Sequence, residues 1–176
     1  FKSEKVIFDC LKSIKNIKEI IIFDNSYDIE TKKKVANIYP NIKFILSKKN
    51  LGYGEANNKI IKLCKTEYLF ILNPDTILQH NCEMELLRSI NELKLNFSII
   101  APISNKKDFG NFDNSKVIFT KKLIKVDFVK GYAMLLNVEK IKKLGMFDKN
   151  IFLYLEEIDL CKRIKEGNQK IFVNKE

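Results

Sequence analysis

Blocks of consecutive apolar residues alternate along the chain with segments in which apolar residues recur every three or four positions. The continuous blocks are typical of buried strands, and the periodic segments are typical of amphipathic helices. Strands are predicted over 19–24, 42–46, 68–72, 98–101, 117–120, 126–129, 132–136 and 170–173. Helices are predicted over about 4–17, 29–39, 55–65, 82–95, 138–144 and 156–166, with caps at Ser3, Asp28, Asn81 and Asn137.

The order of these elements indicates the fold class. In the first part of the chain each strand is followed by a polar corner and a helix, which is the arrangement of βαβ units. Such units form a mainly parallel sheet flanked by helices, so we expect an α/β fold in a single domain. The pattern fails from Ser104 to Ser115, where Asn, Asp, Lys and Gly dominate and an exposed loop is expected.

The predicted strand Tyr68–Leu72 ends at the corner Asn73-Pro-Asp75, which cannot continue a sheet because proline has no N–H to donate. Ligands of open α/β sheets bind beyond the carboxyl ends of the strands, and Asp24 and Asn50 follow the two preceding strands. The carboxylate of Asp75 is a hard oxygen ligand suited to Mg²⁺ or Mn²⁺. The alternative is an Asx turn that only caps the strand.

The stretch Asn50-Leu-Gly-Tyr-Gly-Glu-Ala-Asn57 lies between a predicted strand and a predicted helix. Gly52 and Gly54 permit a tight loop and a close approach of the backbone to a ligand, and the amides of Asn50 and Asn57 can bind a base or a ribose. The third glycine of the dinucleotide fingerprint and the Gly-Lys-Ser/Thr of a P-loop are both missing. A flexible turn with a helix cap is the alternative interpretation.

Three carboxylates gather at the start of the last predicted helix, at Glu156, Glu157 and Asp159, and Arg163 lies one turn beyond Asp159. The helical spacing brings Glu156 and Asp159 near each other while Glu157 points elsewhere. Carboxylates crowded against the apolar segment 152–155 are suited to general-base catalysis, because burial and like charges raise their pKa. The alternative is a solvated first turn, where the helix dipole favours acidic residues.

The formal net charge of +10 raises the question of a nucleic-acid partner, but only two of the 32 basic residues are arginine. Recognition of bases and phosphates favours the planar guanidinium group, so we expect no nucleic-acid partner and place the lysine runs on solvated surfaces. A basic face that holds the protein near an anionic membrane or a diphosphate substrate stays open as an alternative.

The cysteines lie far apart, at positions 10, 64, 82 and 161, and the chain has a single histidine, His80. A Cys/His zinc site is therefore not predicted, and the thiols are expected to be reduced. No apolar run approaches the ~18 residues that cross a bilayer, and the N-terminus lacks the layout of a signal peptide. We expect a cytoplasmic protein, with the inner face of the cytoplasmic membrane as an alternative location.

Taken together and in this order, several stretches resemble those of family-2 glycosyltransferases, most closely the bacterial rhamnosyltransferase-like branch. The resemblance covers nearly the whole chain, and the ordered set is more specific than any single motif. The stretches that carry it are Phe23-Asp-Asn-Ser26, Asn50-Leu-Gly-Tyr-Gly54 with Asn57, Leu72-Asn-Pro-Asp-Thr76, Gly131-Tyr-Ala-Met-Leu135, Gly145-Met-Phe-Asp148 and Phe152-Leu-Tyr-Leu-Glu-Glu-Ile-Asp-Leu160.

The resemblance implies a GT-A fold and an inverting transfer from a UDP- or dTDP-linked sugar to a glycan or lipid-linked acceptor in surface polysaccharide synthesis. It implies that Asp24 contacts the nucleotide, that Asp75 meets the diphosphate through a divalent cation, Mg²⁺ or Mn²⁺, and that Glu157 is the catalytic base. The donor half is expected over about 1–102 and the acceptor half over about 103–176. Further donor-side candidates are Asn25, Asn50, Gly52, Gly54, Asn57 and Asn73, and acceptor-side or supporting candidates are Gly131, Tyr132, Glu156, Asp159 and Arg163.

The chain departs from the family pattern at the base and at both ends. Family members usually have aspartate at the base position, so Glu157 reaches one methylene further. The family opens with a buried strand that is absent here and usually continues beyond the last strand. We therefore expect a chain clipped at both ends, with a gap beside the strand 19–24. The rival functions are a non-catalytic nucleotide-sugar or glycan-binding remnant, a sugar-phosphate nucleotidyltransferase and a basic nucleic-acid binder.

Overall fold

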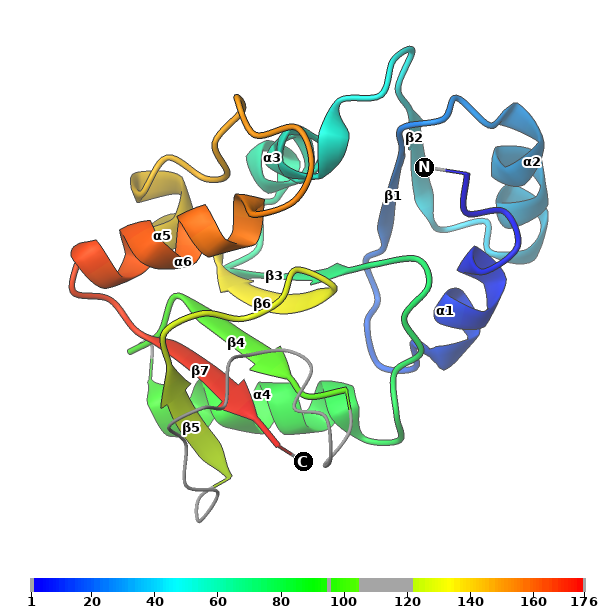
Figure 1. Ribbon diagram of the computed structural model, residues 1–176. Coiled ribbons are helices and arrows are strands. Elements are labelled where there is room, and N and C mark those ends of the chain that lie inside the picture. Colours follow the sequence, from blue (N-terminus) through cyan, green and yellow to red (C-terminus); the bar gives the residue numbers. More distant parts are fainter. Residues whose placement is uncertain (1, 95, 105–121, 176) are drawn as a thin grey trace.

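The computed structural model describes residues 2–94, 96–104 and 122–175. Figure 1 shows the arrangement of the elements. In chain order they are α1 (Ile7–Ser13), β1 (Ile21–Asp24), α2 (Ile29–Ile38), β2 (Lys43–Leu46), α3 (Gly52–Leu63), β3 (Tyr68–Leu72), α4 (Cys82–Leu93), β4 (Ile99–Pro102), β5 (Leu123–Val126), β6 (Ala133–Asn137), α5 (Val138–Lys143), α6 (Glu156–Glu166) and β7 (Ile171–Asn174). The strand predicted over 117–120 and most of the predicted loop 104–115 lie outside the described residues.

Two of the four predicted helix caps are confirmed by side-chain hydrogen bonds. Asp28 caps α2 by accepting from the Thr31 N–H (2.9 Å), and Asn137 caps α5 by accepting from the Lys140 N–H (3.1 Å). The other two predictions are wrong. Helix α1 begins only at Ile7, and Asn81 precedes α4 in a left-handed conformation without a side-chain cap. Local sequence permits a cap, but the direction from which the chain enters the helix decides whether the side chain reaches it.

One strand position, one helix end and one helix start also differ from the predictions. Strand β5 covers 123–126 instead of 126–129, and α1 ends at Ser13 instead of about 17. Helix α3 begins at Gly52, about three residues earlier than predicted, so the glycine-rich stretch forms its first turn and not a separate loop. A glycine-rich sequence has weak intrinsic helix propensity, which tertiary contacts override here.

The strands form two separate sheets. Strands β1 and β2 pair in parallel, and a five-stranded sheet has the order β3-β6-β4-β7-β5. Within the larger sheet only β4 and β7 are parallel, while β6 runs antiparallel to β3 and β4, and β5 runs antiparallel to β7. The expected α/β fold is confirmed, with mixed instead of mainly parallel pairing. Strands β3, β4 and β7 run in one direction and β5 and β6 run in the other, so each of the latter two pairs antiparallel with its neighbours.

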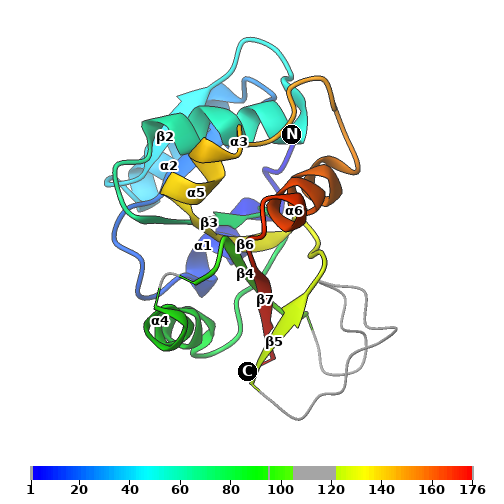
Figure 2. The ribbon, with the colours of Figure 1, turned by 90° about the vertical axis from the view of Figure 1, so that its left-hand side faces the viewer.

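Helices cover both faces of the five-stranded sheet. One face packs Ile99 and Met134 against Ile141 of α5 and Leu160 of α6, and the opposite face packs Ile100 against Leu86 of α4. Figure 2 shows α4 apart from α5 and α6, with the sheet between them. A smaller third cluster joins α1 and α2 to the two-stranded sheet. No helix of the described residues has the length and apolar character that crossing a membrane requires.

A gap separates β1 from β3, as expected from the sequence. These two strands belong to different sheets, and between them lies a cavity of about 890 Å³ that Leu11 of α1 and Ile60 of α3 also line. Figure 1 shows the two strands standing apart. Among the described residues no strand occupies this position. The polar residues at the carboxyl ends of β1 and β3 line the same cavity.

The backbone of each strand beside the gap has one unpaired edge. The carbonyls of Ile20 and Asp24 accept from the N–H groups of Lys43 and Ser47. Alternate residues of a strand face the same neighbour, so the N–H and C=O groups of Ile21 and Phe23 point away from β2 and into the gap. On β3 the corresponding hydrogen bonds to the β6 side are made by Glu67 and Asn73, which leaves Phe70 and Leu72 to face the gap in the same way.

Candidate functional site

Asp24 ends β1 and is buried at the carboxyl edge of the two-stranded sheet. One carboxylate oxygen accepts from the N–H and the hydroxyl of Ser26, and the other accepts from the N–H of Asp28 (2.7 Å). The side chain therefore fixes the turn between β1 and α2 while it lines the large cavity. Each carboxylate oxygen already accepts a hydrogen bond from the protein, so only its remaining lone pairs are available to a ligand.

The amides of Asn25 and Asn50 join the end of β1 to the start of α3. Asn25 donates through Nδ2 to the carbonyl of Gly52 (3.0 Å) and accepts the Leu51 N–H (3.1 Å). Asn50 accepts the Gly52 N–H (3.0 Å). Asn57 lies one turn further along α3, donates to the carbonyl of Tyr53 (3.1 Å) and lines the same cavity as Asp24. These contacts fix a polar rim along one end of the cavity.

Gly52 and Gly54 allow α3 to pack against the segment that precedes α6. Gly52 has a φ of +77°, and a Cβ atom there would lie 2.1 Å from the carbonyl oxygen of Phe152. A Cβ atom at Gly54 would lie 3.1 Å from the Cβ atom of Phe147. The close backbone approach that the sequence suggested for a ligand is therefore made with the protein itself at Gly52. No local pattern shows this contact, because its two sides are 100 residues apart.

Tyr53 lies between these glycines and links residues predicted for the donor side to Gly131, which is predicted for the acceptor side. Its hydroxyl donates to the carbonyl of Gly131, and its ring packs edge-on against Phe147, with centroids 5.8 Å apart. Burial and the nearby charges of Glu157 and Glu156 raise the pKa of Tyr53. Sequence reasoning missed this residue. The available signal was a large aromatic side chain between two glycines.

Glu156 and Glu157 are the first two residues of α6, as predicted. Glu156 is 4% exposed, and its Oε2 atom has no hydrogen-bond partner among the described residues. Burial, followed by the charge of Glu157, raises the pKa of Glu156. Glu157 is half-buried. The raised pKa that the sequence pattern predicted for this cluster is therefore found at Glu156, whereas Glu157 keeps access to solvent.

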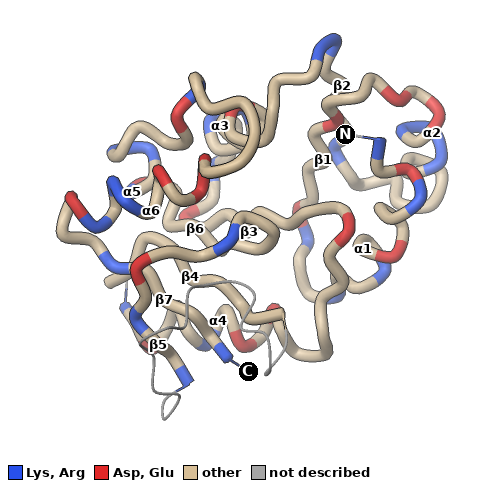
Figure 3. The backbone as a smooth tube through the Cα atoms, in the orientation of Figure 1, with Lys and Arg blue, Asp and Glu red and all other residues tan. Residues whose placement is uncertain are grey.

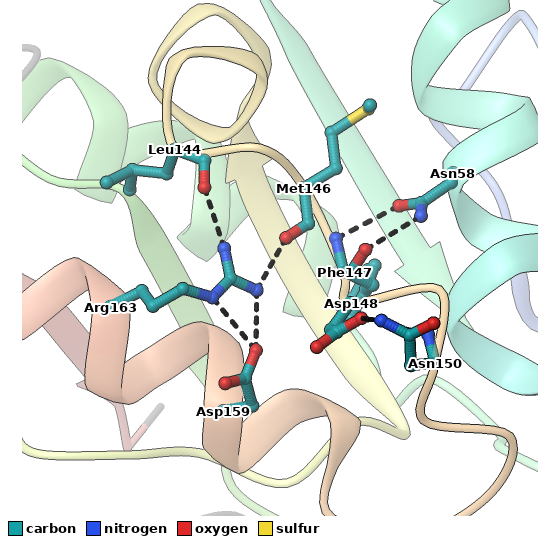
Figure 4. Close-up of polar contacts among 8 residues, drawn as sticks. All are labelled: Asn58, Leu144, Met146, Phe147, Asp148, Asn150, Asp159 and Arg163. Atoms are coloured by element: carbon teal, nitrogen blue, oxygen red, sulfur yellow. Dashed lines mark hydrogen bonds and ion pairs between the residues drawn. The ribbon is translucent and has the colours of Figure 1, made fainter.

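Arg163 and Asp159 hold α6 against the turn that precedes it, as Figure 4 shows. The Arg163 guanidinium donates to the Asp159 carboxylate (2.7 and 2.9 Å) and to the carbonyls of Leu144 (2.7 Å) and Met146 (2.6 Å). These contacts support a role for Arg163 in stabilising the acidic cluster. Buried Asn58, which sequence reasoning missed, fixes the same turn by exchanging two hydrogen bonds with the backbone of Phe147 (2.9 and 3.0 Å).

Asp75 lies at the edge of a second cavity of about 540 Å³, which His80 and Tyr132 also line. Asn73 lines both cavities, and its N–H donates to the carbonyl of Tyr132 (2.8 Å). Tyr132 is half-buried, and this burial raises the pKa of its phenol. The corner after β3 therefore joins the cavity at Asp24 to the one at Asp75.

The ligand chemistry of Asp75 fits a magnesium-like ion held jointly with a substrate. The Asp75 side chain is exposed, and the described residues contain no group of three or more His, Cys, Asp or Glu side chains that could enclose a metal. Mg²⁺ retains several waters and is commonly bound by one or two carboxylates together with substrate phosphates. A single accessible carboxylate at a strand end provides that kind of site.

Figure 3 shows lysine and arginine distributed over all parts of the described chain, without a single basic stripe. The predicted donor-side residues, the Asn73-Pro-Asp75 corner and the two glutamates instead lie around the ends of β1, β3 and α3. These are the ends at which α/β sheets bind ligands.

The four cysteines are free, as predicted.

This arrangement defines a GT-A type of glycosyltransferase fold. The solved structure of mannosyltransferase PcManGT from Pyrobaculum calidifontis, in complex with GDP-Man and Mn²⁺, superposes with a TM-score of 0.71 at 12% sequence identity, covering 98% of this chain and 52% of that one. At sequence level, the model of the glycosyl transferase family 2 matches residues 1–158, and the chain belongs to that family.

Two relatives illustrate its place in the family. The chain is 27% identical to the low-salt glycan biosynthesis hexosyltransferase Agl10 of Haloferax volcanii, over 97% of this chain and 61% of that protein. It is 24% identical to the rhamnosyltransferase WbbL of Escherichia coli, over 83% of this chain and 66% of that protein. The chain thus spans less than two thirds of the length of either relative.

Proposed function

We propose that this chain carries the catalytic site of an inverting glycosyltransferase, which moves a hexosyl or deoxyhexosyl group from a nucleoside-diphosphate sugar to a hydroxyl of a glycan or lipid-linked acceptor. The observation that carries the proposal is the position of Tyr53. It follows Gly52 at the cavity of Asp24 and donates to Gly131, while the charges of Glu156 and Glu157 act on its phenol. Contacts from one side chain to both the cavity of Asp24 and Gly131 support a single site for donor and acceptor.

The donor is proposed to bind with its nucleoside at the cavity end formed by Asp24, Asn25, Asn57 and Asn73. Carboxylate and amide groups match the N–H and carbonyl edges of a pyrimidine base and the hydroxyls of a ribose. A UDP- or dTDP-linked sugar is the expected donor. The solved neighbour that binds GDP-Man supports the wider class of nucleoside-diphosphate sugars.

The diphosphate is proposed to extend from Asn73 towards Asp75, because these two residues line the second cavity. Asp75 would hold a divalent cation, Mg²⁺ or Mn²⁺, whose charge would neutralise the leaving diphosphate. The solved neighbour contains Mn²⁺, which supports a divalent cation. This placement of the donor corresponds to a division of the chain into a donor half, over about 1–102, and an acceptor half, over about 103–176.

Glu157 is the proposed catalytic base. Its carboxylate removes the proton of the acceptor hydroxyl while that oxygen attacks the anomeric carbon from the face opposite the diphosphate. One carbon–oxygen bond forms to the acceptor, the bond to the diphosphate oxygen breaks, and the nucleoside diphosphate leaves with the bonding electrons. Glu157 suits this task because it is partly accessible, whereas Glu156 is buried and its pKa is raised by that burial.

A screen of UDP-, dTDP- and GDP-sugars for thermal stabilisation, with and without Mn²⁺, tests the proposal. A ligand that binds only the native state raises the melting temperature. At a ligand concentration of about 100 times the Kd, the free energy of unfolding rises by about 2.7 kcal/mol. Asp75→Asn should abolish the Mn²⁺-dependent part of the shift without unfolding the protein. Asp9→Asn, an exposed carboxylate on α1 that lines neither cavity, is the matched control and should leave it unchanged.

Each rival function predicts a different result. Release of nucleoside diphosphate from the stabilising donor in the presence of acceptor supports transfer, whereas release of pyrophosphate would identify a nucleotidyltransferase. Stabilisation without any turnover would identify a binding protein. An absence of stabilisation by every nucleotide sugar would contradict the proposal, and an unchanged Mn²⁺ response in Asp75→Asn would remove that residue from the site.

A further inference from the structure

Four consecutive large apolar side chains are exposed immediately before the two glutamates of α6. Phe152, Leu153, Tyr154 and Leu155 are 55%, 52%, 76% and 67% exposed. The other exposed large apolar side chains of the described residues occur singly along the sequence. Single exposed apolar residues are normal on protein surfaces, but a continuous group marks a surface that contacts something other than water.

The backbone holds these side chains outward in a fixed position. Tyr154 and Leu155 both have left-handed conformations, with φ of 68° and 70°, which non-glycine residues rarely adopt. The carbonyl of Phe152 accepts the Tyr53 N–H (3.3 Å), and the missing Cβ atom of Gly52 makes room for this contact. The segment 152–155 is therefore tied to the first turn of α3 and presents its apolar side chains from a defined place.

Lysines lie next to this apolar segment. Exposed Lys48 and Lys49 occupy the turn just before Gly52, where the Ser47 hydroxyl donates to the carbonyl of Lys49 (2.6 Å), and exposed Lys149 precedes the segment. Figures 1 and 2 show the turn before α3 and the segment before α6 at the same end of the molecule, and Figure 3 shows the basic tip of that turn. Within the described part of the chain, these three lysines form no ion pair.

We propose that this end of the protein, formed by 152–155 with Lys48, Lys49 and Lys149, docks on the surface of an anionic lipid bilayer. Apolar side chains that enter the boundary between headgroups and acyl chains, flanked by lysines that meet anionic headgroups, are the combination that interfacial binding requires. The net charge of +10 favours the same partner. Since Glu157 follows the segment by two residues, the docked protein presents its proposed base to acceptors held at that surface.

Co-sedimentation of the whole chain with vesicles tests this inference. Vesicles of phosphatidylcholine alone should bind weakly, and vesicles that contain phosphatidylglycerol should bind at least tenfold more strongly, with the difference shrinking as salt screens the charges. The double variant Leu153→Ser/Tyr154→Ser removes apolar contact and should lower the partition coefficient about tenfold. Lys48→Glu/Lys49→Glu should lower it by at least about tenfold, because both charges are reversed.

Matched controls separate the proposed surface from general effects. Ile29→Ser/Ile38→Ser removes exposed apolar side chains from α2, and Lys32→Glu/Lys34→Glu makes the same change in net charge there. Both controls should bind vesicles like the unmodified protein, and all variants should keep its melting temperature. Equal losses in controls and test variants would overturn the proposal, as would an absence of binding to the anionic vesicles.

A second copy of the chain is the competing occupant. If Leu153→Ser/Tyr154→Ser converts a dimer to a monomer in sedimentation equilibrium, and the unmodified protein does not bind vesicles, the surface is a self-association site and the proposal fails. Vesicle binding is measured without donor or acceptor. Its failure therefore leaves the proposed sugar transfer unaffected, and a failure of the donor screen leaves the vesicle result unaffected.

Discussion

The two sheets of this protein are built from similar apolar sequences, yet they differ in how completely they are covered. Every residue of β4 and β6 in the five-stranded sheet is buried, whereas in the two-stranded sheet Asp24 is the only buried residue. Strand β6 has a neighbour on each side, and β1 has one neighbour and an open cavity. Asp24 thus ends a strand of the less supported sheet, and the proposed base Glu157 lies on α6, which packs on the larger sheet.

This difference separates two kinds of contribution. The five-stranded sheet, with helices on both faces, supplies most of the core, because the largest cluster of buried residues lies on it. The two-stranded sheet supplies the polar ends at the large cavity. Substitutions in the first region should therefore act mainly on stability, and those at the edge of the second mainly on ligand binding.

The largest expected effect concerns the stability of the two sheets. Leu136→Ala in β6 removes a fully buried side chain and should lower the free energy of unfolding by about 2–5 kcal/mol, the usual range for such a cavity. Ile22→Ala in β1 shortens a half-buried side chain beside the gap and should cost less than about 2 kcal/mol. Urea unfolding of both variants measures the difference. Equal losses would show that the two sheets are equally supported.

A strand added to the gap should reduce the contrast between the sheets. Ser3 and Glu4 line the large cavity, so an engineered segment of about five alternating Val and Ile residues, joined ahead of the first residue through a short turn, can reach it. Pairing with the free edges of Phe23 and Phe70 while burying apolar side chains should raise the free energy of unfolding by about 3 kcal/mol. A Gly-Ser segment of equal length is the control. Equal melting temperatures would show that the gap does not accept a strand.

The separation of donor and acceptor functions can be tested by a pair of substitutions. Glu157→Gln should reduce turnover by roughly 100-fold, the usual scale for loss of a general base, with little change in donor affinity. Asn57→Ala at the large cavity should instead weaken donor binding. Steady-state kinetics with a donor from the thermal screen distinguishes the two outcomes. If Glu156→Gln reduces turnover more than Glu157→Gln, the base has been assigned to the wrong glutamate.

The smallest expected effect is a pH dependence of stability at Glu156. Burial raises the pKa of this carboxyl in the folded protein, so folding favours its protonated form. The corresponding stability is fully present below the unfolded pKa and is lost as the pH rises through the folded pKa. Glu156→Gln should therefore equal the unmodified protein in acid and exceed it in stability at pH 8. Denaturant unfolding at both pH values measures this, and a parallel pH dependence in the two proteins would contradict the burial of a titrating group at this position.

Local features of the sequence determined the positions of most elements and of the polar corners. A block such as Tyr68–Leu72 is apolar throughout and ends at Pro74, so its limits need no knowledge of other segments. The caps Asp28 and Asn137 act on residues three positions away. The pair Glu156 and Glu157 begins a helix where the helix dipole favours acids, and the pattern placed this start correctly.

Contacts between distant segments decided what the sequence alone left open. The hydrogen bond from Tyr53 to Gly131 joins residues 78 positions apart, and the contact of Gly52 with Phe152 joins residues still further apart in the sequence. Burial of one glutamate and not of its neighbour likewise depends on which face of α6 meets α3. Periodicity indicates whether a segment forms a helix or a strand. Strand direction, the pKa of a side chain and the contacts of a glycine depend instead on the other segments that pack against that segment.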